Sequence, residues 1–198
     1  MASAEEREAI RQAVRKISAG FPGAYWRDID KAGEYPQGFV DALTASGYLA
    51  ALIPEEYGGA GLGMAEAGII LEEINNSPGN ALACHAQMYT MGTLLKHGSP
   101  EQKQRYLPQI ASGKLRLQAF GVTEPNAGSE TTKIETRAVR KGGKYIVTGQ
   151  KIFISRVKAV RFAALRVGFI RARPARTPTI VRFRTKSFNR ARCSGSRW

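Results

Sequence analysis

Apolar residues recur every three or four positions through most of the first 113 residues, which is the period of one face of an α-helix. In the first such segment Ile10, Val14 and Ile17 share a face, and Gly20 follows as a stop. The last segment begins at Ser99, which precedes a proline and stands three residues before a glutamine, the signature of a capped helix start. The pattern predicts helices over residues 5–19, 36–46, 64–74, 81–96 and 99–112.

After Lys114 the period of the apolar residues shortens to two, which is typical of β-strands. Alternating segments occupy residues 115–120, 136–140 and 144–148, and Gly142-Gly143 suits a two-residue hairpin turn between the last two. This order predicts an α+β protein. An all-α helical domain over residues 1–114 is followed by a β-domain that starts at residue 115.

Positive charge is concentrated at the end of the chain. The 198 residues have a formal charge of +14, but residues 1–155 hold 17 Lys/Arg against 16 Asp/Glu. Residues 156–198 hold 13 Lys/Arg and no acidic residue. We predict that residues 158–198 form a basic, disordered tail. Any contact of this tail with nucleic acid is expected to be non-specific, because it would act on phosphates through charge.

Several classes of function find no support in the residues. Cys84 and Cys193 are too far apart for a disulfide framework, and His85 and His97 have no carboxylate or cysteine at ligand spacing, so no metal site is predicted. No apolar run approaches the roughly eighteen residues of a membrane span. The acidic N-terminus lacks the features of a secretory signal. We expect a cytoplasmic protein without membrane contact.

A glycine-rich loop, Tyr57-Gly-Gly-Ala-Gly-Leu-Gly63, has two interpretations, a phosphate cradle or a structural turn. Backbone N–H groups at the start of a helix bind anions. The loop lacks the Lys-Ser/Thr pair of a P-loop, however, and does not follow a clear strand. We therefore predict a structural turn.

The segment that carries most chemistry is Ala119-Phe-Gly-Val-Thr-Glu-Pro-Asn-Ala-Gly-Ser-Glu130. Thr123 and Ser129 place hydroxyl groups on either side of a turn in which Gly128 leaves room for a ligand to approach the backbone. Phe153 and Ser155 repeat the pairing of a flat apolar face and a hydroxyl. These features suit a planar heteroaromatic ring with an attached pyrophosphate; the alternative is an ordinary surface turn followed by a strand.

Four motifs follow one another between Tyr35 and Val157. They are Pro54-Glu-Glu-Tyr-Gly-Gly-Ala-Gly-Leu62, Gly98-Ser-Pro-Glu-Gln-Lys-Gln-Arg-Tyr-Leu-Pro108, Thr123-Glu-Pro-Asn-Ala-Gly-Ser129 and Gly149-Gln-Lys-Ile-Phe-Ile-Ser155. Together they resemble the acyl-CoA dehydrogenase family of flavoenzymes. The resemblance implies an incomplete β-barrel-like middle domain over residues 115–157. It also implies FAD as cofactor, an acyl-CoA substrate oxidised to its α,β-enoyl form, an electron-transfer flavoprotein as partner, and a homo-oligomer.

The resemblance assigns roles to residues of the first turn. Phe120, Val122 and Thr123 would line the edge of the flavin, and Thr123 would hydrogen-bond the ring. Gly128 and Ser129 would contact the pyrophosphate, and Ser129 would also bind the pantetheine arm of the substrate.

In the second segment the resemblance places Phe153 on the isoalloxazine face, where many relatives have tryptophan, and Ser155 at its polar edge, where many have threonine. Glu130 stands where aspartate is usual. Phe153 still provides an aromatic face and Ser155 still provides a hydroxyl group.

No catalytic residue is assigned, because the family carries its base in a C-terminal helical bundle that does not follow Val157. Glu124 belongs to the turn by the same resemblance. We expect this chain to be inactive alone. The abrupt basic composition after Val157 favours translation in a shifted reading frame. The alternative is a non-catalytic binding protein that contacts nucleic acid through the tail.

Overall fold

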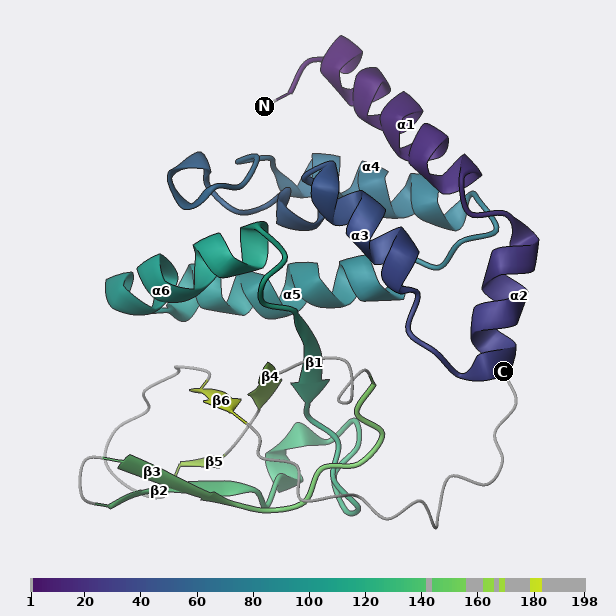
Figure 1. The fold of residues 1–198 in the computed structure, drawn as a ribbon. Helices are drawn as coiled ribbons and strands as arrows, with labels where there is room; N and C mark the ends of the chain where they lie inside the picture. Colours follow the sequence, from purple (N-terminus) through teal and green to yellow (C-terminus); the bar gives the residue numbers. More distant parts are fainter. Residues whose placement is uncertain (1, 142–143, 156–161, 166–167, 170–178, 183–198) are drawn as a thin grey trace.

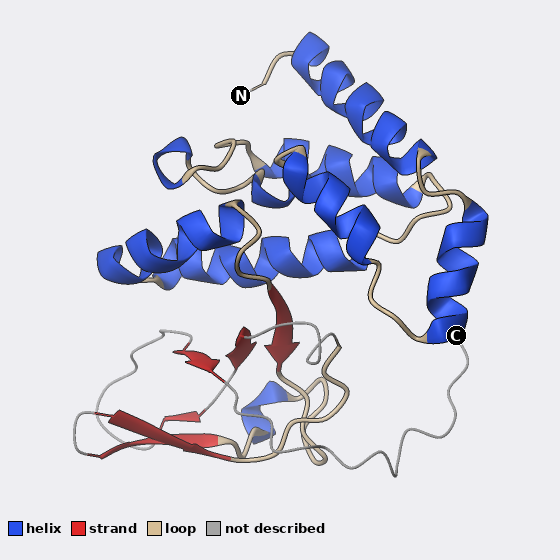
Figure 2. Ribbon diagram, in the orientation of Figure 1, coloured by secondary structure: helices blue, strands red, loops and turns tan. Residues whose placement is uncertain are grey.

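The computed structural model describes residues 2–141, 144–155, 162–165, 168–169 and 179–182. Six α-helices form the N-terminal part, and the strands lie beneath them in the view of Figures 1 and 2. The helices are α1 (Ala4–Ala19), α2 (Gly23–Ala32), α3 (Gln37–Ala45), α4 (Met64–Asn75), α5 (Leu82–His97) and α6 (Pro100–Ala111). The five predicted helices correspond to α1 and α3 to α6.

Capping residues set the helix boundaries. Ser99 and Gln102 form the predicted capping box at the start of α6, and Pro108 lies inside that helix without ending it. Helix α2 was not predicted. It begins after Pro22 and ends at Gly33, whose φ of 65° is the left-handed conformation of a helix C-cap.

Buried carboxylates fasten α1 to α4. Arg7 Nε donates to Glu66 Oε1 at 2.9 Å, and Arg11 and Arg15 both donate to Glu73, at 2.7 and 2.6 Å. Glu66 and Glu73 are almost fully buried. Hydrogen bonds from Arg7 lower the pKa of Glu66, and those from Arg15 and then Arg11 lower the pKa of Glu73. These contacts make α4 the acidic partner of a basic face of α1.

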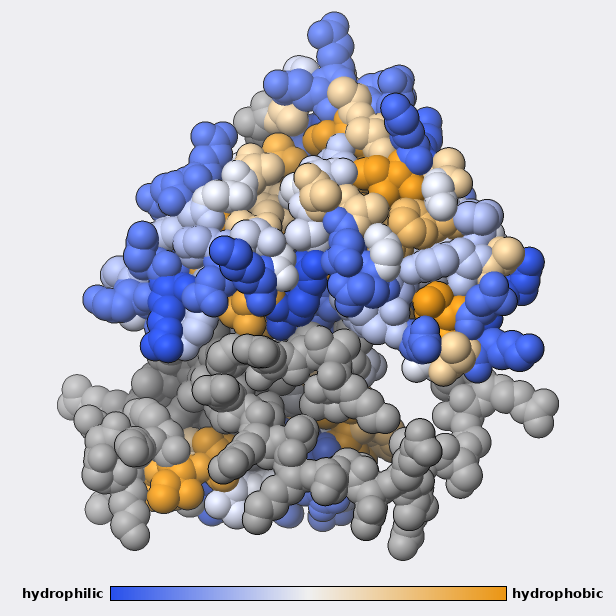
Figure 3. Space-filling model, in the orientation of Figure 1, coloured by the Kyte–Doolittle hydropathy of each residue, from blue (hydrophilic) through white to orange (hydrophobic). Residues whose placement is uncertain are grey.

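Two apolar clusters fill the helical part. The first packs α1, α3 and α4 around residues such as Phe39, Ile70 and Ile74. The second joins α5 and α6 and includes Leu117, the first residue of strand β1 (Leu117–Gly121). Because this strand contributes to the second cluster, its position is fixed by the helices. Figure 3 shows polar and charged side chains over much of the helical face, with apolar patches between them.

A buried polar chain also anchors β1. The Tyr35 hydroxyl donates to Gln118 Oε1 at 2.5 Å, and Gln118 Nε2 donates to Gln87 Oε1 at 3.2 Å. Gln87 Nε2 in turn donates to the Leu49 carbonyl at 3.0 Å. Satisfied polar networks of this kind fix one arrangement in a core. The position of β1 relative to the helices is therefore fixed, and so is the point at which the following turn begins.

The other described strands, together with β1, form two three-stranded sheets. They are β2 (Arg137–Lys141), β3 (Lys144–Thr148), β4 (Phe162–Leu165), β5 (Gly168–Phe169) and β6 (Thr179–Arg182). One sheet has the order β1-β4-β6, with β1 parallel to β4, and the other has the order β3-β2-β5. Strands β2 and β3 pair antiparallel as predicted, but the Gly142-Gly143 turn lies outside the described residues. No helix in the described ranges has the length and apolarity needed to cross a membrane.

The glycine-rich loop is a structural turn, as predicted. The N–H groups of Gly58 and Gly61 donate to the carbonyls of Glu55 and Ile53, both at 2.8 Å. Leu62 N–H donates to the Ala51 carbonyl at 2.7 Å. These donors are engaged by carbonyl groups of the residues just before the loop, which leaves them unsuited to cradle a phosphate.

Candidate functional site

A tight turn follows β1 and contains the first predicted binding segment. Glu124 N–H donates to the Ala127 carbonyl at 3.0 Å, and Ala127 N–H donates back to the Glu124 carbonyl at 3.2 Å. Glu124 and Ala127 are buried, whereas Pro125 and Asn126 form the exposed tip. We call residues 122–129 the first site segment and residues 149–155 the second site segment.

The structure brings the two site segments together. Ile152 N–H donates to the Thr123 carbonyl at 3.0 Å. The Lys151 ammonium donates to the Val122 carbonyl at 2.7 Å and to Glu124 Oε1 at 2.8 Å. Residues 27 positions or more apart in sequence thus meet through both backbone and side chain. The prediction that the two segments serve one site is consistent with this contact.

Glu124 is a structural carboxylate. Besides Lys151, it accepts N–H hydrogen bonds from Glu135 at 2.7 Å and from Thr136 at 3.0 Å. Burial alone would raise the pKa of Glu124, but Lys151 and these donors together lower the pKa to about 2. A carboxylate with so low a pKa accepts a proton poorly at neutral pH. Its assignment to the turn rather than to catalysis agrees with these contacts.

Gly149 permits the close approach of the second site segment to Thr136, the residue just before β2. A Cβ atom at this position would lie 2.6 Å from the Thr136 Cα. Thr136 N–H is one of the donors to Glu124, so the glycine, the threonine and the carboxylate meet in one packed junction. A cavity of about 360 Å³ adjoins this junction and is lined by polar residues that include Asn126 and Glu135.

Two aromatic side chains of the predicted site face outward. Phe153 is 89% exposed and has a φ of 56°, the only positive φ of a non-glycine residue in the described part of the chain. Such conformations are strained and cluster at ligand-binding positions. Phe120 is 37% exposed, and its ring centroid lies 5.8 Å from that of Tyr89 on α5. Tyr89 was not predicted, since its position in the helix gave no sign that it meets β1.

The polar groups of the site are accessible. Ser129 and Ser155 are exposed and Thr123 is half-buried, and their hydroxyls have no hydrogen-bond partner among the described residues. A Cβ at Gly128 would meet no atom within 4 Å, so the backbone there is open to a ligand. Val122 contributes its carbonyl to Lys151. The predicted residues therefore offer two flat apolar faces, three hydroxyls and one open stretch of backbone.

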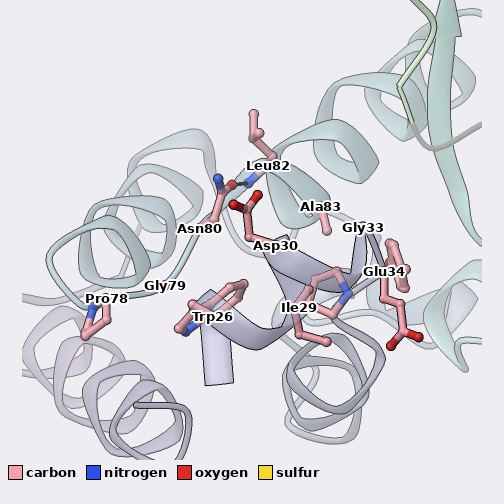
Figure 4. A pocket seen from close by; sticks show the side chains of 12 residues that line it. Trp26, Ile29, Asp30, Gly33, Glu34, Pro78, Gly79, Asn80, Leu82 and Ala83 are labelled. Carbon is pink, nitrogen blue, oxygen red and sulfur yellow. Dashed lines mark hydrogen bonds between the residues drawn. The ribbon is translucent and has the colours of Figure 1, made fainter. Parts of the chain in front are cut away.

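A second cavity, of about 440 Å³, lies away from the predicted site (Figure 4). It is formed by α2, the loop after it and the start of α5. Trp26 and Ile29 contribute apolar surface, and Asp30 and Glu34 contribute carboxylates. None of the predicted binding residues lines it.

Two sequence families match consecutive parts of the chain. The acyl-CoA dehydrogenase N-terminal domain matches residues 4–114, and the acyl-CoA dehydrogenase middle domain matches residues 119–182. The chain belongs to the acyl-CoA dehydrogenase family. The resemblance inferred from the four motifs is confirmed, and so is the predicted fold of a helical domain followed by a partial sheet.

Relatives of this acyl-CoA dehydrogenase family member are longer. Acyl-CoA dehydrogenase FadE12 of Mycobacterium tuberculosis (strain ATCC 25618 / H37Rv) is 39% identical over 165 residues, which are 83% of this chain and 42% of the relative. The structure of acyl-CoA dehydrogenase from Geobacillus kaustophilus gives a TM-score of 0.80 at 29% identity, over 93% of this chain and 50% of that chain. A structure of the electron transferring flavoprotein of Acidaminococcus fermentans contains a chain with a TM-score of 0.80 at 27% identity, over 94% of this chain and 50% of that one. The chain spans about half the length of these relatives, or somewhat less.

The family match reaches further than the motifs do. It continues past Val157 to residue 182, and β4, β5 and β6 lie within the segment predicted as a disordered tail without a family match. These strands are short, and frequent arginines obscure their alternation in the sequence. Residues 183–198 lie outside the described residues.

Proposed function

We propose that this chain supplies the flavin- and substrate-binding part of an FAD-dependent oxidoreductase of the acyl-CoA dehydrogenase type, whose reaction is the α,β-dehydrogenation of acyl-CoA thioesters. The observation that carries the proposal is the meeting of the two site segments. It places the exposed ring of Phe153 and the hydroxyl of Thr123 on segments joined by the Ile152–Thr123 hydrogen bond. When bound, FAD would accept the hydride that the substrate loses.

The described residues fit an isoalloxazine ring and a diphosphate. The exposed ring of Phe153 and the partly exposed ring of Phe120 offer stacking surface for a planar ring. Thr123 and Ser155 would supply hydrogen bonds to its polar edges, since hydroxyls both donate and accept. The open backbone at Gly128 and the hydroxyl of Ser129 would bind the diphosphate, and Ser129 would also bind the pantetheine arm of the substrate.

The described residues supply binding and orientation rather than a proton acceptor. Glu124 is the buried carboxylate of the first site segment, and its ion pair with Lys151 keeps it from acting as the base. We therefore propose that the 198-residue chain alone holds FAD weakly and does not turn over acyl-CoA. The similarity to a chain in the electron transferring flavoprotein structure supports such a flavoprotein as redox partner. A homo-oligomer and a cytoplasmic location complete the proposal.

Replacing Phe153 by alanine is expected to weaken FAD binding about fivefold, because the loss of one aromatic stacking surface is worth roughly 1 kcal/mol. FAD is titrated into the purified chain, and quenching of flavin fluorescence is measured. Ile146→Ala is the matched control, since Ile146 is also an exposed apolar residue of the β-domain, 53% exposed. Equal FAD affinity of Phe153→Ala and the parent chain would contradict the proposed flavin site.

A further inference from the structure

The two site segments are joined by a buried ion pair that no binding role requires. Lys151 and Glu124 have side chains only 9% and 5% exposed. A second ion pair nearby, Lys133 with Glu130, has a similar distance of 2.7 Å but is 64% and 60% exposed. A surface pair of this kind contributes little to structure, whereas breaking a buried pair leaves an uncompensated charge. This contrast in burial indicates that the Lys151–Glu124 pair holds the local structure in place, whereas the Lys133–Glu130 pair does not.

The pair connects three parts of the β-domain. Glu124 Oε1 accepts from Lys151 and from Thr136 N–H, and Glu124 Oε2 accepts from Glu135 N–H. The Lys151 ammonium also donates to the carbonyl of Val122, beside Thr123. The first site segment, the two residues just before β2 and the second site segment are therefore held at a single point. Charge-assisted hydrogen bonds of this kind are stronger and more directional than neutral ones.

The pair also lies next to the strained residue of the site. Lys151 precedes Phe153 by two positions, and the residue between them, Ile152, donates its N–H to the Thr123 carbonyl. A phenylalanine with a φ of 56° keeps that conformation only where its surroundings determine it. Because the Phe153 side chain is almost fully exposed, its own packing does not hold it. The restraint must come from the backbone that Lys151 and Ile152 fix.

We propose that Glu124 and Lys151 are positioning residues. They hold the first and second site segments in the mutual arrangement that presents Thr123 and Phe153 to the same ligand, before that ligand binds. The part of this inference that concerns FAD rests on the proposed function. The part that concerns the two segments does not.

Amide hydrogen exchange of the FAD-free chain tests the arrangement directly. In Lys151→Met and in the milder Glu124→Gln, the Ile152 and Thr136 amides are expected to exchange about tenfold faster or more, because the junction opens locally. Lys133→Met removes the same charge from the exposed pair and is expected to leave those amides unchanged. Amides of α5 report global unfolding and are expected to keep their protection in every variant. Unchanged exchange at Ile152 in both Lys151→Met and Glu124→Gln overturns the proposal.

FAD titration separates positioning from mere structure. Lys151→Met and Glu124→Gln are expected to bind FAD about tenfold more weakly than the parent, while Lys133→Met binds equally well. Lys151→Arg restores a cation beside Glu124 and is expected to regain part of both the affinity and the amide protection. Faster exchange with unchanged FAD affinity overturns the positioning role. Failure of the parent chain itself to bind FAD counts against the proposed function, and the exchange result then decides whether the pair holds the segments.

Discussion

Replacing Gly59 by alanine is expected to destabilise the helical domain by about 3 kcal/mol or more, because the added methyl group has nowhere to go. A Cβ at position 59 would lie 2.6 Å from the carbonyl carbon of Ile53. The atoms it meets are backbone and Cβ atoms of a residue that is fully buried, so no side-chain rotation relieves the clash. Thermal unfolding followed by far-UV circular dichroism measures the loss.

Gly68→Ala is the matched control for this prediction. Gly68 lies within α4, and a Cβ there would meet no atom within 4 Å. Alanine in a helix interior is about 0.5–1 kcal/mol more favourable than glycine, so this variant is expected to unfold at a slightly higher temperature than the parent. A Gly59→Ala variant as stable as the parent would show that the glycine-rich loop moves freely, contrary to its hydrogen bonds.

Glu73→Gln is expected to lower the melting temperature by several degrees at neutral pH. The substitution removes the charge that Arg11 and Arg15 share, and it leaves two guanidinium groups facing a neutral amide. The effect should depend on pH in a defined direction. Because the folded pKa of Glu73 is lowered from its usual 4.5, its stabilisation is complete above about pH 4.5 and is lost as the pH falls through the folded pKa. The melting temperatures of parent and variant are therefore expected to converge in acid.

Glu72→Gln tests whether burial, rather than pairing as such, makes the difference. Glu72 accepts a hydrogen bond from Arg11 at 2.8 Å, but its side chain is 55% exposed, against 1% for Glu73. Exposed pairs of this kind are screened by water and contribute little. The melting temperature of Glu72→Gln is expected to stay within about a degree of that of the parent. A similar loss in both variants would argue against a special role for the buried carboxylate.

The sequence was sufficient where local chemistry decides structure. The capping residues Ser99 and Gln102 placed the start of α6 correctly, and alternation gave the antiparallel pair β2 and β3. Helix α2 was missed because it starts at Gly23, directly after a proline, and glycine there suggests a loop. The parallel pairing of β1 with β4 joins segments that are distant in sequence, so the local sequence pattern does not predict it.

The candidate site was predictable in its parts but not in its assembly. Thr123 and Phe153 belong to motifs that can be recognised in the sequence, and both motifs lie within residues 119–182, which match the middle domain of the family. The contact of Lys151 with Glu124 depends on two segments 27 residues apart, so nothing in either segment reveals it. The left-handed conformation of Phe153 is likewise set by tertiary structure, because phenylalanine by itself avoids positive φ.

The spacing of the arginines on α1 has a consequence for how that helix docks. Arg7, Arg11 and Arg15 repeat every four residues, whereas Glu66 and Glu73 stand seven apart on α4. Sliding α1 by one turn in one direction would leave Glu66 without an arginine, and sliding it the other way would leave Glu73 with one instead of two. Only one alignment of α1 on α4 therefore pairs Glu66 with an arginine and Glu73 with two.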